Sequence, residues 1–203
     1  MHIAHFTDAA TFMQRAGAFL EAHEAEHCLL LGIAATLSQR PDPARPRPYL
    51  AVVEDGATVV AVAVQTPPFN VVLSLTDAPA TLALLAGDLH ARGEPVPGVI
   101  GATEVSAAFV QHWRALTGQP ARRTVAERIY RLARVQPISG VPGRMRRIAE
   151  ADRAFIREWL VAFDQEALGN SEHEDEDDLN RAIDRYLTSP ITGLYVWEDD
   201  GTV

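Results

Sequence analysis

The chain has 203 residues, of which 47% are hydrophobic and 22% are charged, a balance typical of a globular protein with a buried core. Its net charge of −9 argues against a general nucleic-acid binder, because neutralising phosphates needs clustered cations. The apolar run from Cys28 to Leu37 is too short to span a bilayer, the N-terminus has no secretion-signal pattern, and a single cysteine excludes an internal disulfide. We therefore expect a cytoplasmic protein that binds neither nucleic acid nor membrane.

Two helices are predicted at the start of the chain. Asp8 precedes an amphipathic stretch and is suited to capping its first turn, which predicts a helix from Asp8 to about Ala25. A second helix is predicted from about Glu26 to Ser38. The proline-rich segment 41–48 ends it, because proline cannot continue the hydrogen bonding of a helix.

A β-hairpin is predicted next. The segments Tyr49–Glu54 and Thr58–Gln65 are apolar and β-branched, and the turn Asp55-Gly56-Ala57 joins them. Neither segment alternates with polar residues, so both faces of these strands should be covered. After Pro67-Pro68, the segment Asn70–Leu75 is predicted to form a third strand.

Helices and strands alternate in the following stretch. Asp77 should cap a helix with Pro79 in its first turn, and Gly98–Gly101 should be a short strand. A helix from Thr103 to Leu116 and a closing strand from Thr124 to Arg134 complete the pattern. The order of elements predicts an α+β fold with one antiparallel hairpin and one βαβ crossover.

The segment Gln136–Gly143, with two prolines and two glycines, is predicted to be a linker. Beyond it we expect a strand, two helices and the start of a second hairpin, in the ranges 144–149, 152–168, 178–187 and 193–197. The helix that begins at Asp152 should bury Trp159 and Phe163, and all three tryptophans, including Trp113 and Trp197, are expected in the core.

The chain repeats its own pattern at a separation of about 144 residues. Asp8 and Phe12 of the first predicted helix match Asp152 and Ile156 of the later one. The first hairpin is echoed by the segment 195–203, which ends at its turn. We therefore expect a second copy that contains only the front half of the first.

Several short stretches carry a resemblance to a known family. They are Phe19-Leu20-Glu21, Leu29-Leu30-Leu31-Gly32-Ile33, Gln65-Thr66-Pro67-Pro68-Phe69-Asn70, Pro97-Gly98-Val99-Ile100-Gly101 and the helix from Phe109 to Trp113. Together with the element order, they resemble the GNAT superfamily of N-acetyltransferases, in particular bacterial members with a degenerate N-terminal copy followed by a second copy. The resemblance implies acetyl transfer from acetyl-CoA to a small-molecule or peptide amine.

The resemblance also implies where acetyl-CoA would bind. In that family, the loop that follows the strand after the hairpin leads into a helix. The backbone N–H groups at the N-terminus of that helix bind the pyrophosphate of acetyl-CoA. The matching positions here are Ser74, Leu75, Thr76 and Asp77, followed by Ala78 and Pro79. This loop has no glycine, Pro79 lacks an N–H, and the carboxylate of Asp77 opposes an anion. We expect the first copy not to bind acetyl-CoA in the usual way.

The expected organisation is a degenerate GNAT-like domain at 1–135, a linker at 136–143 and the N-terminal half of a second GNAT-like domain at 144–203. The expected function is N-acetyltransferase, truncated or catalytically incomplete in this chain, with no catalytic residue assigned. By the same resemblance, Phe163, Glu166 and Trp197 would line an acceptor pocket. The alternative is a non-catalytic binding or dimerisation module, because an unpaired strand near Val203 favours association, including a homodimer.

Two other patterns were weighed as metal sites. His23-Glu24-Ala25-Glu26-His27 matches the zinc-protease motif, which makes a zinc hydrolase a third reading, but the motif needs a third ligand and a helix junction near Ala25 would separate the two histidines. The acidic run 172–178 lacks the ligand spacing of a calcium loop. We assign no metal. Cys28 is expected to be a buried, inert thiol.

Overall fold

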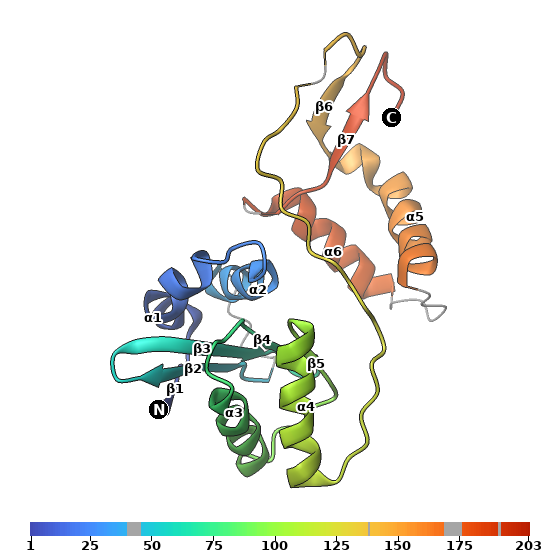
Figure 1. Cartoon of the computed structure of the whole chain (residues 1–203). Helices are drawn as coiled ribbons and strands as arrows, with labels where there is room; N and C mark the ends of the chain where they lie inside the picture. Colours follow the sequence, from blue (N-terminus) through green and yellow to red (C-terminus); the bar gives the residue numbers. More distant parts are fainter. Residues whose placement is uncertain (40–45, 138, 169–175, 191) are drawn as a thin grey trace. The chain divides into compact units, whose positions relative to one another are not determined.

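The computed structural model describes residues 1–39, 46–137, 139–168, 176–190 and 192–203, which form two compact units. Unit 1 is Met1–Ala133 and unit 2 is Arg134–Val203 (Figure 1). None of the described helices has the length and apolar composition needed to cross a membrane.

Unit 1 is built on a single mixed sheet. In chain order its elements are β1 (His2–His5), α1 (Ala9–Glu21), α2 (Cys28–Gln39), β2 (Tyr49–Asp55), β3 (Thr58–Gln65), β4 (Val71–Leu73), α3 (Ala80–Ala91), β5 (Val99–Ile100) and α4 (Thr103–Thr117). The strands are ordered β1-β2-β3-β4-β5, and every pair is antiparallel except β4 and β5. Helix α3 connects that parallel pair. The predicted α+β class with a mostly antiparallel sheet is confirmed.

Helices cover both faces of this sheet, α1 and α2 on one face and α3 and α4 on the other (Figure 1). Alternate residues of β2 divide between the two cores. Leu50 and Val52 pack with Phe12 and Leu30 from α1 and α2. Ala51 and Val53 lie in the core that α3 and α4 complete. Both faces of β2 and β3 are therefore buried, as their continuous apolar sequences predicted.

Two aspartates predicted to cap helices behave differently. Asp8 caps α1, since the Thr11 N–H donates to Asp8 Oδ1 over 2.8 Å. Asp77 does not cap α3: the residue at that position is Pro79, and no side-chain hydrogen bond caps this helix. The prediction for Asp77 was wrong because the chain runs two residues further before the helix begins.

The closing strand predicted at Thr124–Arg134 is not formed. These residues lie in neither helix nor strand, and the side chains of Val125, Ile129 and Leu132 are 68%, 58% and 75% exposed. A strand needs a partner, and β5 contains only two residues. The opposite error occurs at the N-terminus, where β1 pairs antiparallel with β2 although four residues gave too little pattern to predict a strand.

Unit 2 is smaller and has one core. Its elements are β6 (Arg144–Arg147), a 3₁₀ turn (Glu150–Asp152), α5 (Arg153–Phe163), a π-helical turn (Asp164–Leu168), α6 (Glu176–Thr188) and β7 (Tyr195–Glu198). The buried core residues are Ile148, Ile156, Leu179, Ile183 and Val196. The acidic residues Glu176, Asp177 and Asp178 form the first turn of α6, where negative charge is favourable. The rest of the acidic run lies outside the described residues.

The strands of unit 2 pair in the same way as the first two strands of unit 1. β6 pairs antiparallel with β7, and Arg144 opposite Glu198 corresponds to His2 opposite Glu54. Both strand pairs are extended by one backbone hydrogen bond. The Phe6 N–H donates to the Leu50 carbonyl in unit 1, and the Ile148 N–H donates to the Leu194 carbonyl in unit 2, each at a distance of 3.0 Å. Both units also place two helices between the paired strands.

Several aromatic side chains predicted in the core are exposed. Trp159, Phe163 and Trp197 are 58%, 60% and 50% exposed, whereas Trp113 packs at the edge of the core under α3 and α4. The prediction rested on their positions on apolar helix or strand faces. Among the described residues of unit 2, only α5 and α6 pack on the strands, so Trp197 on the other face of β7 stays open to solvent.

Candidate functional site

The loop that the sequence singled out follows β4 and leads into α3. The pairing of β3 with β4 continues one residue beyond the strand, because the Ser74 N–H donates to the Val62 carbonyl over 2.9 Å. The Ser74 hydroxyl accepts the Val62 N–H and donates to the Leu75 carbonyl, both over 2.8 Å. Ser74 is 1% exposed. The start of the loop is thus fixed to the sheet.

The N–H of Leu75 donates to a histidine in the turn between α1 and α2. It donates to Nε2 of His27 over 3.0 Å, and Nδ1 of His27 donates to the Leu20 carbonyl, also over 3.0 Å. An N–H group can only donate and a carbonyl can only accept, so these partners fix the neutral tautomer of His27 with its proton on Nδ1. His27 is 1% exposed and stacks against Phe19 with ring centroids 5.7 Å apart.

Burial lowers the pKa of His27 below its ordinary value, and the charge of His23 acts in the same direction. The hydrogen bond to the Leu20 carbonyl and the charge of Glu26 act in the opposite direction but are outweighed. The neutral ring is therefore the stable form at neutral pH, and it is the form that can accept the Leu75 N–H.

The remainder of the loop is also hydrogen bonded within itself. The Ala78 N–H donates to Thr76 Oγ1 over 3.1 Å, and the Thr81 hydroxyl and N–H both donate to the Ala78 carbonyl. Pro79 at the start of α3 has no N–H to offer. Asp77 is exposed beside them.

These residues do not fit the pyrophosphate of acetyl-CoA. An anion site at a helix N-terminus needs free N–H groups and no competing negative charge. Here the N–H groups of Leu75 and Ala78 already have acceptors within unit 1, and Asp77 adds a carboxylate. The structure places Ser74, Leu75, Thr76 and Asp77 in one loop after β4, which ends at Leu73 rather than at the predicted Leu75. It adds His27, whose contact with this loop was not predicted from the sequence.

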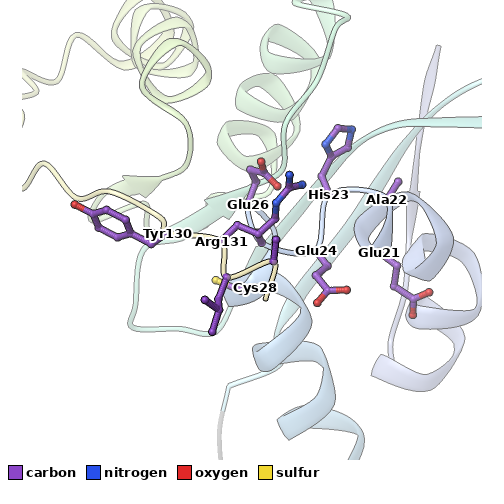
Figure 2. Close-up of a pocket in the computed structure, with 11 residues that line it drawn as sticks. Glu21, Ala22, His23, Glu24, Glu26, Cys28, Tyr130 and Arg131 are labelled. Carbon is purple, nitrogen blue, oxygen red and sulfur yellow. The ribbon is translucent and has the colours of Figure 1, made fainter. Parts of the chain in front are cut away.

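The two histidines of the zinc motif lie close together, with ring centroids 5.9 Å apart, but the fold engages them differently. His27 uses both ring nitrogens inside unit 1, whereas His23 is exposed and lines a different hollow of about 530 Å³. Figure 2 shows that hollow, formed by the turn between α1 and α2 and by residues after α4, including Tyr130 and Arg131. Within the described part of the chain, no group of three His, Cys, Asp or Glu side chains is placed to hold a metal ion. His27 is therefore not available as a zinc ligand, which argues against a zinc hydrolase.

Cys28 lies at the rim of the same hollow and is exposed. The prediction of a buried thiol was wrong because Leu30 and Ala34, rather than the start of the helix, carry the buried face of α2. Cys28 shares this hollow with Glu24, Glu26 and Arg131.

The three residues proposed to line an acceptor pocket come from different parts of unit 2. Phe163 ends α5, Glu166 lies in the π-helical turn after it, and Trp197 lies on β7. The indole N–H of Trp197 donates to the Pro142 carbonyl over 2.9 Å. Among the described residues no hydrogen bond or ion pair joins Phe163, Glu166 and Trp197, and their shared pocket stays a prediction.

The three arginines of β6 are engaged in unit 2 itself. Arg146 binds both carboxylate oxygens of Asp152, at 2.5 and 2.9 Å, and also pairs with Glu198. Arg147 donates from one Nη atom to the carbonyls of Tyr186, Ser189 and Thr192. Arg144 is mostly exposed and lies 3.5 Å from Glu198. Two of the three are therefore structural rather than phosphate ligands.

Comparisons of this chain with protein-family models, with curated proteins and with solved structures found no match.

Proposed function

We propose that this chain belongs to the GNAT-type N-acetyltransferases, whose reaction moves an acetyl group from acetyl-CoA to an amine, and that its unit 1 is a copy that binds no acetyl-CoA. The family assignment rests on the element order and on the mixed sheet β1-β2-β3-β4-β5, in which α3 joins the one parallel pair. The repeated strand pairing of β6 with β7 supports a second copy of the front half of this fold.

The observation that carries the loss of binding is the bond between Leu75 and His27. In the family pattern, the end of this strand and the following loop offer backbone N–H groups to the cofactor. In unit 1 the Leu75 N–H is held by a buried imidazole over 3.0 Å. Removing that contact to admit a ligand would leave Nε2 of His27 buried without a partner, which is unfavourable.

A binding or dimerisation module is the second candidate function. Its support is the uncovered side of the sheet in unit 2, where Met145 and Trp197 are paired opposite one another and are 65% and 50% exposed. Exposed apolar side chains on a strand favour contact with another chain. The measurement for this candidate is the molar mass in solution over a range of protein concentrations.

The first test is a calorimetric titration of acetyl-CoA into the 203-residue chain. We expect no saturable binding tighter than about 1 mM, because the N–H groups of Leu75 and Ala78 already have acceptors and Asp77 adds a negative charge. Micromolar binding, or acetylation of an amine added with acetyl-CoA, would contradict the proposal for unit 1.

A variant tests the family assignment separately. Asp77→Gly with Pro79→Ala removes the carboxylate and restores an N–H at the start of α3, and should gain measurable affinity for CoA. Asp55→Gly makes the same charge change at the turn after β2 and should gain none. Equal behaviour of the two variants would remove the support for an ancestral phosphate loop at this position.

A further inference from the structure

His27 is held on both sides by backbone groups from distant parts of unit 1. Its Nδ1 donates to the end of α1 and its Nε2 accepts from the loop after β4, 48 residues along the chain. This single side chain ties the turn between α1 and α2 to the loop that leads into α3. The contact with Leu75 uses the one ring atom that gains a proton when a neutral imidazole of this tautomer becomes charged.

We propose that His27 is a proton-sensitive positioning residue: the neutral imidazole holds the loop after β4 closed, and the protonated imidazole releases the N–H of Leu75. The proposal uses only the contacts of His27 and is independent of the family proposed above.

The chemical step is a proton transfer from water or buffer to Nε2. The new Nε2–H then faces the Leu75 N–H, so an attractive contact between a donor and an acceptor becomes a repulsive contact between two donors. The Nδ1–H bond to the Leu20 carbonyl is unaffected, and it keeps the ring in place. The strain therefore falls on the loop, whose Leu75 and Thr76 are only partly buried.

The groups around His27 determine the pH at which its ring becomes protonated. The charged or titratable groups that act on His27 come from its own turn: His23, with ring centroids 5.9 Å apart, opposes protonation, and Glu26 favours it. From α1 the ring meets Phe19 and the Leu20 carbonyl, and from the loop after β4 it meets the Leu75 backbone, none of which carries a charge. The change should therefore lie on the acid side of the ordinary value of 6.5.

Release of Leu75 would expose a backbone donor at the end of β4. Its partner would have to supply an acceptor atom, such as a carbonyl or carboxylate oxygen. This defines the chemical class of ligand that the open form of unit 1 could take, and it predicts that such ligands bind only under acid conditions.

The test is nuclear magnetic resonance of the full chain during an acid titration. We expect the ring resonances of His27 and the amide resonance of Leu75 to shift together with one midpoint below about 6.5. Hydrogen exchange of the Leu75 amide, corrected for its intrinsic pH dependence, should rise at least about tenfold once His27 is charged.

Two variants separate this role from ordinary packing. His27→Gln offers an acceptor and a donor that do not titrate, so its Leu75 resonance should lose the pH dependence while unit 1 stays folded. His23→Gln, in the same turn, should keep the joint response of His27 and Leu75, with its midpoint moved to higher pH because His23 no longer opposes protonation. The proposal is overturned if Leu75 does not respond when His27 titrates, if His27 stays neutral until unit 1 unfolds, or if His23→Gln abolishes the response. Should His27→Gln fail to fold, the wild type and His23→Gln decide the question.

Discussion

Single polar residues connect distant elements of this protein through hydrogen bonds between partly buried side chains. Asp88 of α3 accepts the hydroxyl of Tyr49 over 2.8 Å and lies 3.2 Å from the ring of His5, so one carboxylate ties a helix to β1 and β2. Burial raises the pKa of Tyr49, and the nearby charge of Asp88 adds to that effect. The phenol is thereby kept neutral as a hydrogen-bond donor at all moderate pH values.

Asp152 has the same role in unit 2, and its effect on stability depends on pH. The hydrogen bonds from Arg146, with a further bond from the Ala149 N–H, lower its pKa from 3.8 to about 2. A carboxylate whose pKa is lower in the folded state stabilises that state fully above its unfolded pKa. We therefore expect this contribution to be lost as the pH falls from about 4 to about 2.

The variant Asp152→Asn isolates this effect. It should lower the unfolding midpoint of unit 2 at neutral pH, and the difference from wild type should shrink as the solution is acidified through that window. Circular dichroism during heating at a series of pH values measures it. Asp184→Asn, which removes a more exposed partner of Arg153, should have a smaller effect at neutral pH. A constant gap between Asp152→Asn and wild type down to the lowest pH would contradict the assignment.

At the scale of single residues, the sequence indicated which residues could form a site, but it did not indicate which groups they would bind. The loop Ser74–Asp77 was located from the resemblance, and in the structure it follows β4. The role of His27 was not predicted, because its partners are Leu75 and Leu20 backbone groups that leave no mark in the side-chain sequence. The sequence signal was a pair of histidines, His23 and His27, near the junction of two predicted helices, which a metal motif explained equally well.

Helix ends provide the clearest prediction at the scale of elements. Asp8 accepts both the N–H and the hydroxyl of Thr11 at the start of α1, whereas Asp77 makes no cap on α3. Asp8→Ala should lower the melting midpoint of unit 1 by about 2–4 °C, because a lost N-cap leaves an N–H of the first turn without a partner. Asp77→Ala is the matched control and should leave the midpoint unchanged. Differential scanning calorimetry gives both values, and equal losses would show that the cap is not what Asp8 contributes.

Long elements with a strong pattern were predictable, and short or unpartnered ones were not. The ranges of β3 and α4 agree with the sequence to within one residue, since their apolar positions face a core on one or both sides. The segment 124–134 also carries regularly spaced apolar residues, interrupted by Glu127, Arg128 and Arg131, but it has no strand to pair with among the described residues. Strand formation depends on a neighbour as much as on composition, so the sequence of one segment could not decide it.

At the scale of the whole molecule, the chain divides into units with very different cores. Unit 1 buries apolar side chains on both faces of its sheet, whereas the core of unit 2 lies on one side of two strands. Small units with one-sided cores are marginally stable. We expect two calorimetric transitions, with unit 2 melting first. A single transition that Asp152→Asn and Asp8→Ala shift equally would show that the units unfold together.

The class of fold was predictable at this scale, because alternating helical and strand patterns restrict the architecture to an α+β sheet with helices on its faces. The burial of Trp159 and Trp197 was not, since it depends on whether a second layer covers the sheet of unit 2. Composition alone assigns tryptophan to the interior, and only the arrangement of neighbouring elements shows that this rule fails here.

The uneven placement of the tryptophans has a practical consequence. Trp113, whose indole N–H donates to Gln119, belongs to unit 1 and is partly buried against Phe109, whereas Trp159 and Trp197 belong to unit 2 and are half exposed. The tryptophan fluorescence of the two units should therefore differ in its emission maximum. We expect a shorter wavelength for Trp113 and a longer one for Trp159 and Trp197. Replacing either set with phenylalanine would leave an intrinsic optical label on one unit alone, and the folding of each could be followed inside the intact chain without any added dye.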